Sequence, residues 1–71
     1  MKTHMKEYRE KIGITQEQLA KKLGVARQTI LFIEKGKYNP SLRLAYQISK
    51  ELNAKIEDLF TFDDENNKVT Q

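Results

Sequence analysis

The sequence contains no cysteine and no tryptophan, and only one proline and three glycines among its 71 residues. Without cysteine the chain forms neither a disulfide nor a thiolate metal site, and this composition fits a reducing cytosol. A domain of this size buries only about 60% of its unfolded surface, so its stability must come from helix packing or from association with another chain. We therefore expect one cytoplasmic domain that carries no metal and no other cofactor.

Long apolar runs are also absent. No stretch approaches the roughly 20 residues that a membrane-spanning helix needs, and residues 1–11 have no apolar segment of the signal-peptide type. We expect no contact with a membrane.

Groups that would support catalysis are scarce. The single histidine, His4, stands near the N-terminus without a second metal ligand in view, and there is no glycine-rich phosphate loop. Glu57 and Asp58 are neighbours in sequence, and adjacent residues of a helix do not face each other, so they make a poor acid–base pair. We expect neither enzymatic activity nor a small-molecule ligand.

The charge of the chain is unevenly distributed, although its net value is only +3. Residues 21–50 contain a single acid, Glu34, and seven basic side chains: Lys21, Lys22, Arg27, Lys35, Lys37, Arg43 and Lys50. Three acids, Asp63, Asp64 and Glu65, follow Phe62. A basic middle segment indicates a polyanionic partner. On charge alone, a solvated lysine-rich surface explains it equally well.

Four residues mark helix ends. Gly13, Gly24, Gly36 and Asn53 each follow a stretch of apolar residues at helical spacing, and glycine or asparagine is typical just past a helix end, where φ turns positive. The pattern predicts helices over residues 3–12, 16–23, 27–35 and 42–52, and a short one over 56–60.

Helix starts and the core also follow from the sequence. Thr15 and Gln18 have the spacing of a capping box, and Ser41 is placed to cap the fourth helix. The apolar positions at helical spacing predict the core. Those residues are Met5, Tyr8, Ile12, Leu19, Leu23, Ile30, Ile33, Leu42, Ala45, Ile48, Leu52, Ile56, Leu59 and Phe60.

Residues 16–35 predict two short helices joined by a tight turn at residues 24–26. Ala20 is small where the second helix of the pair crosses the first, and Gly24 supplies the positive φ that a Cβ disfavours. Apolar packing between the two helices favours a near-perpendicular angle. That angle lets the second helix stand clear of the domain and enter a major groove of DNA.

Residues 3–60 resemble the Cro/CI-type, or Xre-like, helix-turn-helix family. The resemblance is carried by the segments ITQEQLAKKLGV, RQTI, IEKGKYNPSL and IEDLF. It implies an all-α, compact five-helix, lambda-repressor-like DNA-binding domain over residues 1–60, followed by a C-terminal extension over 61–71. It also implies a bacterial transcriptional regulator that binds operator DNA as a homodimer, with repression as the simplest mechanism.

The resemblance assigns roles to individual positions. Arg27, Gln28 and Phe32 match base-reading positions; arginine suits guanine, glutamine suits adenine, and a phenylalanine can meet a thymine methyl. Gln16, Thr29, Lys35, Lys37, Tyr38 and Asn39 match positions that contact the DNA backbone. Arg43 opposes the helix dipole at the start of the fourth helix, which a nearby phosphate would explain. Arg9 and Glu34 match an internal salt bridge.

The sequence departs from the family pattern in three places. Ala26 and Lys55 stand where a side chain usually caps the third and fifth helices, and at Ala26 the missing cap should cost about 1 kcal/mol. Leu31 and Phe32 are apolar on a face expected to be polar. These two slightly favour a protein-interaction module that uses the same fold. An antitoxin is a further alternative, although the long toxin-binding tail is missing.

The C-terminal extension provides a candidate dimer interface. Phe60 and Phe62 alternate with Thr61, which is a strand pattern, and the resemblance implies a strand that contributes to dimerisation. A dimer would read two half-sites about 34 Å apart in a near-palindromic operator. The acidic residues after Phe62 are expected to be disordered.

Overall fold

The structure, a computed structural model, describes residues 1–62, and the acidic tail expected from residue 63 lies outside the described residues. Within residues 1–62 the order is β1 (Lys2–Thr3), α1 (Met5–Ile12), α2 (Gln16–Leu23), α3 (Arg27–Glu34), α4 (Leu42–Leu52), α5 (Ile56–Leu59) and β2 (Phe60–Thr61). The predicted five-helix architecture is confirmed, and α2 and α4 have the predicted bounds. The helix predicted from residue 3 begins only at Met5, because the two residues before His4 form a strand.

The helix ends are fixed by the predicted local interactions. Thr15 Oγ1 accepts the backbone N–H of Gln18 at 3.0 Å, and Gln18 Oε1 accepts the backbone N–H of Thr15 at 2.8 Å, which completes the capping box before α2. Ser41 Oγ accepts the backbone N–H of Leu44 at 3.1 Å and caps α4. Asn53 ends α4 in the left-handed conformation at φ 54°.

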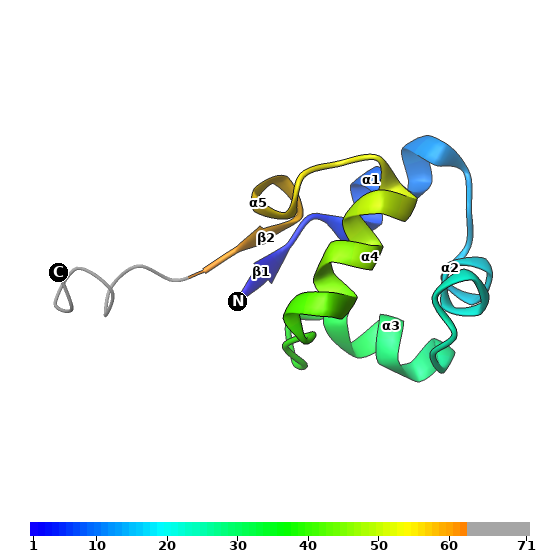
Figure 1. The fold of residues 1–71 in the computed structure, drawn as a ribbon, viewed down its shortest axis with the longest axis horizontal. Coiled ribbons are helices and arrows are strands. Elements are labelled where there is room, and N and C mark those ends of the chain that lie inside the picture. Colours follow the sequence, from blue (N-terminus) through cyan, green and yellow to red (C-terminus); the bar gives the residue numbers. More distant parts are fainter. Residues whose placement is uncertain (63–71) are drawn as a thin grey trace, which may run out of the picture.

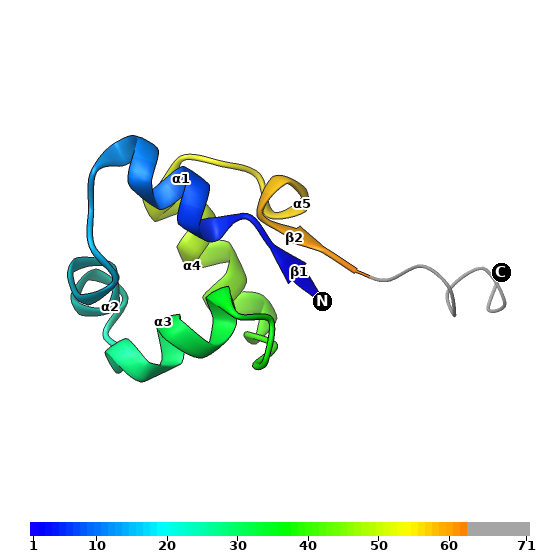
Figure 2. The same ribbon diagram turned by 180° about the vertical axis from the view of Figure 1, so that it is seen from behind.

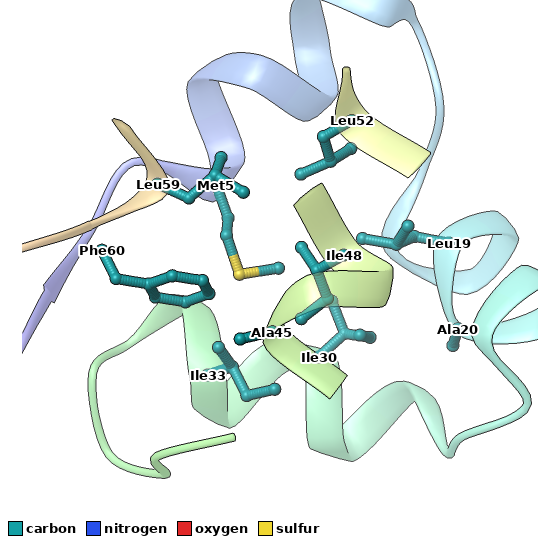
Figure 3. Packing of buried hydrophobic residues seen from close by; sticks show 10 residues of the cluster. All are labelled: Met5, Leu19, Ala20, Ile30, Ile33, Ala45, Ile48, Leu52, Leu59 and Phe60. Carbon is teal, nitrogen blue, oxygen red and sulfur yellow. The ribbon is translucent and has the colours of Figure 1, made fainter. Parts of the chain in front are cut away.

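The core lies between α1, α3 and α4, with α2 and α5 closing two of its sides. Figure 3 shows Met5 of α1 reaching toward Ile48 and Ala45 of α4, with Ile30 and Ile33 of α3 beneath them. The fully buried side chains are Met5, Leu19, Ile30, Ile33, Ile48, Leu52 and Leu59. Their burial at helical spacing is what holds these short helices together, since helices of this length are marginal on their own.

Two predicted core residues lie at the surface instead. Ile12 is 47% exposed and Leu42 is 79% exposed. Ile12 is the last residue of α1 and Leu42 is the first residue of α4. At both positions the apolar residues at helical spacing extend beyond the part of the helix that a neighbouring element covers.

The two ends of the described chain meet in a small antiparallel sheet. Lys2 pairs with Thr61 and Thr3 pairs with Phe60, and the N–H of His4 extends the pairing to the carbonyl of Leu59 at 2.8 Å. Figures 1 and 2 both show β1 and β2 side by side, next to α5. The predicted C-terminal strand therefore exists, but within this chain its partner is the N-terminal strand.

The start of α3 provides a test of this description of the helix ends. Ala26 has the extended conformation of an N-cap, at φ −72° and ψ 149°, and no side chain caps the helix. We expect Ala26→Ser to raise the free energy of unfolding by about 1 kcal/mol, because its hydroxyl would accept an unpaired N–H of the first turn. Thr15→Ala, which removes an existing cap, should lower stability by a similar amount. Urea denaturation measures both, and no gain in Ala26→Ser would contradict the expectation.

Candidate nucleic-acid interface

α2 and α3 form a helix-turn-helix in which α3 is presented at the surface. Figure 1 shows α2 nearly end-on and α3 lengthwise, so the two helix axes cross steeply. Ala20 is 3% exposed in α2, and its carbonyl accepts the N–H of Val25 at 3.0 Å across the turn. Gly24 ends α2 at φ 72°, as its place in the sequence predicted.

The faces of α3 differ sharply in burial. Ile30 and Ile33 are fully buried, while Arg27, Gln28 and Phe32 are exposed. Phe32 follows Gln28 by four residues, which places the two side chains on the same face of the helix. The three side chains predicted to read bases therefore lie on the solvent side of α3, and Thr29 and Leu31 are half-buried beside them.

The loop after α3 is fastened to the last turn of the helix. The N–H of Gly36 donates to the carbonyl of Ile33 at 2.9 Å, and the N–H of Lys37 donates to the carbonyl of Phe32 at 2.9 Å. Gly36 has φ 75°, and a Cβ at this position would collide with the backbone carbonyl of Met1. Glycine is required here both by the backbone conformation and by the closeness of the N-terminal segment.

Polar and charged side chains follow the last turn of α3. The exposed members of this group are Lys35, Lys37, Tyr38 and Asn39, and Arg43 is exposed in the first turn of α4. Because the backbone N–H groups of Lys35 and Lys37 donate to carbonyls of α3, the backbone of these two residues is tied to the end of the helix. The geometry thus joins cationic side chains to the end of the helix that carries Phe32.

Glu34, the only acid among residues 21–50, is turned into the protein. Its Oε2 lies 2.8 Å from Arg9 Nε, and its Oε1 lies 3.3 Å from Arg9 Nη2. Arg9 Nη1 also donates to the carbonyl of Ile14 at 3.0 Å. The side chains of Arg9 and Glu34 are only 9% and 7% exposed, so this is a buried, bidentate ion pair between α1 and α3.

Gln16 takes part in the same network, which sequence reasoning did not foresee. Its side-chain Nε2 donates to Glu34 Oε1 at 3.0 Å, so one of its two amide hydrogens is used inside the protein. The other hydrogen and the carbonyl oxygen remain for an outside partner. The predicted phosphate contact of Gln16 is compatible with this arrangement and stays a prediction.

Thr3 is a second residue that the sequence reasoning missed. Its Oγ1 donates to the backbone carbonyl of Glu34 at 3.0 Å, which ties β1 to the last turn of α3. Nothing in the local pattern identifies this contact, since Lys2 to His4 are polar and continue directly into a helix. Only the pairing of β1 with the distant β2 places Thr3 against α3.

The comparisons with known proteins agree with this geometry. A helix-turn-helix family model matches residues 5–59, which is most of the chain. The chain belongs to the Xre-like helix-turn-helix family. Its members are transcriptional regulators, so the chain is a transcriptional regulator with a helix-turn-helix DNA-binding domain and not an enzyme.

The relatives of this regulator come from archaea and from bacteria. An HTH-type transcriptional regulator of Archaeoglobus fulgidus is 68% identical over 65 residues, which are 92% of this chain and 93% of the relative. One from Bacillus subtilis is 48% identical over 66 residues, covering 93% of this chain and all of the relative. Family membership therefore does not restrict the chain to bacteria.

Solved structures that are similar to this regulator include two with a TM-score of 0.71. The restriction-modification controller protein C.AhdI of Aeromonas hydrophila has a TM-score of 0.71 and 30% identity, covering 79% of this chain and 85% of that protein. A hypothetical transcription factor of Neisseria also has a TM-score of 0.71, with 25% identity over 92% of this chain and 75% of that protein.

None of the helices within residues 1–62 has the length and apolar character that crossing a bilayer requires. The same residues contain no group of three or more histidine, cysteine, aspartate or glutamate side chains placed to hold a metal ion.

The buried ion pair generates a stability prediction. We expect Arg9→Ala to lower the free energy of unfolding by about 3 kcal/mol, because the Glu34 carboxylate would stay buried without its charged partner. A double variant, Arg9→Met with Glu34→Leu, should recover much of the loss because it removes both charges. Urea denaturation monitored by circular dichroism gives both values. A single variant as stable as the wild type would contradict the structural role of the pair.

Proposed function

We propose that this regulator is a repressor that binds a near-palindromic operator as a homodimer, with α3 in the major groove. The observation that carries the proposal is the exposed face of α3 and the cationic loop hydrogen-bonded to it. The bound protein would then block the access of RNA polymerase to the operator.

The DNA contacts can be assigned by chemistry. Arg27 and Gln28 stand in the first turn of α3, where arginine is the preferred reader of guanine and glutamine can read adenine. Lys35 and Lys37 would neutralise phosphates beside the groove, where they act on every duplex alike. Tyr38, Asn39, Thr29 and Gln16 would donate hydrogen bonds to the DNA backbone, and Arg43 would add one more cation from α4. In this assignment one set of contacts reads the bases, and the other set positions the protein on the duplex.

Selection of bound sequences from a random duplex pool tests the proposal. We expect wild-type protein to enrich one sequence, and Arg27→Ala to lose about 1–3 kcal/mol of specific affinity and relax preference at one base position. Lys37→Gln should enrich the same sequence as the wild type while the slope of log affinity against log salt falls by about one unit. Lys55→Gln is the matched control, because Lys55 precedes α5, which lies away from α3 in both views (Figures 1 and 2). Unchanged selection by Arg27→Ala would remove that residue from base reading.

An apolar groove supports a second copy of this chain as the dimer partner. The groove is lined by Met1, Asn39, Pro40, Leu42, Ala45, Ile56, Phe60 and Phe62. Among these lining residues Leu42 and Phe62 are 79% and 58% exposed, and Phe60 is buried. Exposed apolar surface of this kind is typical of interaction sites. Asn39 and Pro40 belong to the loop after α3, so pairing through this groove would bring two α3 helices to one side of a dimer.

Sedimentation tests the dimer and its interface. We expect the wild-type chain to dimerise at tens of micromolar, and Phe62→Ser to shift the equilibrium at least tenfold toward monomer, because it removes a large apolar side chain from the interface. Ile12→Ser is the matched control, since Ile12 is an exposed apolar residue of α1 and does not line the groove. A wild-type monomer, or a Phe62→Ser chain that dimerises equally well, would rule out this interface.

A further inference from the structure

Phe32 is an aromatic side chain that the fold leaves at the surface of α3. It is 39% exposed, although its neighbours Ile30 and Ile33 are fully buried. It belongs neither to the buried core cluster nor to the partly buried residues packed against that cluster. It does not line the groove that carries Phe62 either. The 39% of its surface that is exposed therefore belongs neither to the core nor to the groove.

The position of Phe32 relative to the loop is fixed by the backbone. The carbonyl of Phe32 accepts the N–H of Lys37, and the carbonyl of Leu31 accepts the N–H of Lys35 at 3.1 Å. If these lysines sit on phosphates at the edge of a major groove, the face of α3 that carries Phe32 points toward base edges. Phe32 is also one turn beyond Gln28 on that face, so both side chains reach the floor of the same groove.

The floor of a major groove offers a phenylalanine few partners. Base edges there are hydrogen-bond donors and acceptors, and burying them under an aromatic ring would leave them unsatisfied. The exception is the methyl group at C5 of thymine. Cytosine methylated at C5 carries the same group at the same ring position. Apolar contact is therefore favourable only where a pyrimidine presents a C5-methyl.

We propose that Phe32 reads the C5-methyl group of a pyrimidine in the operator, and that the chain distinguishes a methylated from an unmethylated pyrimidine at that position. The inference rests on the proposed function, because it places α3 in the major groove. It adds a ligand chemistry to the site: one methyl group, supplied by thymine or by 5-methylcytosine.

The experiment compares matched duplexes that differ in one methyl group. In the sequence selected by the wild-type chain, each thymine is replaced in turn by uracil. At the position that responds, the base pair is then exchanged for cytosine–guanine, with and without the C5-methyl. Affinities are measured for the wild type, for Phe32→Ala and for Tyr46→Ala. Tyr46 is the control because it is an exposed aromatic of α4, 55% exposed and outside α3.

We expect the wild type and Tyr46→Ala to bind a methylated duplex about fourfold more tightly than its unmethylated match, the effect of burying one methyl group. In Phe32→Ala the two affinities should become equal. A response in the thymine–uracil pair shows that the methyl group of thymine is read, and a response in the cytosine pair at the same position shows that 5-methylcytosine can supply the same methyl group. If no pair responds, or if the response persists in Phe32→Ala, the proposal is wrong. Failure to select any sequence would instead overturn DNA reading itself, so the two failures are distinguishable.

Discussion

The ion pair between Arg9 and Glu34 is the interaction on which the placement of α3 depends. It joins α1 to the last residue of α3, and Gln16 at the start of α2 donates to the same carboxylate. A carboxylate buried to this degree must be paired and hydrogen-bonded, because an isolated buried charge is far more costly than the pair. The net gain in stability over an apolar substitute is small. What the network determines is the relative placement of three helices, and so the angle at which α3 stands in the domain.

The same end of α3 is held by the termini of the described chain. Thr3 donates to the carbonyl of Glu34, and the backbone of Met1 packs against Gly36 directly after the helix. Since β1 is paired with β2, a displacement of the C-terminal strand would be transmitted to the loop after α3. At its other end the helix has no capping side chain at Ala26. The last turn of α3 thus receives side-chain hydrogen bonds from α1, α2 and β1, whereas its first turn has no side-chain cap.

The sequence predicts local features well because each has a local cause. The capping box of Thr15, the cap at Ser41 and the left-handed ends at Gly24 and Asn53 depend only on neighbouring residues, so α2 and α4 appear where the pattern places them. The core prediction is wrong at Ile12 and Leu42, because helical spacing alone does not show where a neighbouring element stops covering a helix.

Contacts between distant segments of the chain were harder to predict from the sequence. The pairing of β1 with β2 joins residues at opposite ends of the described chain, and strands of two residues are too short to carry an alternating pattern. Without that pairing, the bond from Thr3 to α3 has no signal in the sequence. The Arg9–Glu34 pair was expected only through the family resemblance, and the bond from Gln16 to Glu34 was not expected at all. Buried polar networks are identified from residues that are neighbours in space, because their members share no periodicity in the sequence.

The difference in contacts between the two ends of α3 also has a consequence for the proposed recognition of DNA. The last turns of α3 carry Phe32, whose proposed contact with a methyl group would be short-ranged and would need a fixed distance to the groove floor. The first turn carries Arg27 and Gln28, whose long polar side chains can adjust to hydrogen-bond base edges. In the proposed dimer the apolar groove lies beside the loop that follows α3. The last turns of each α3 would then face the dyad and the first turn would face outward. Spacing between half-sites would be set by the last turns, while tolerance to base changes would increase toward the outer positions.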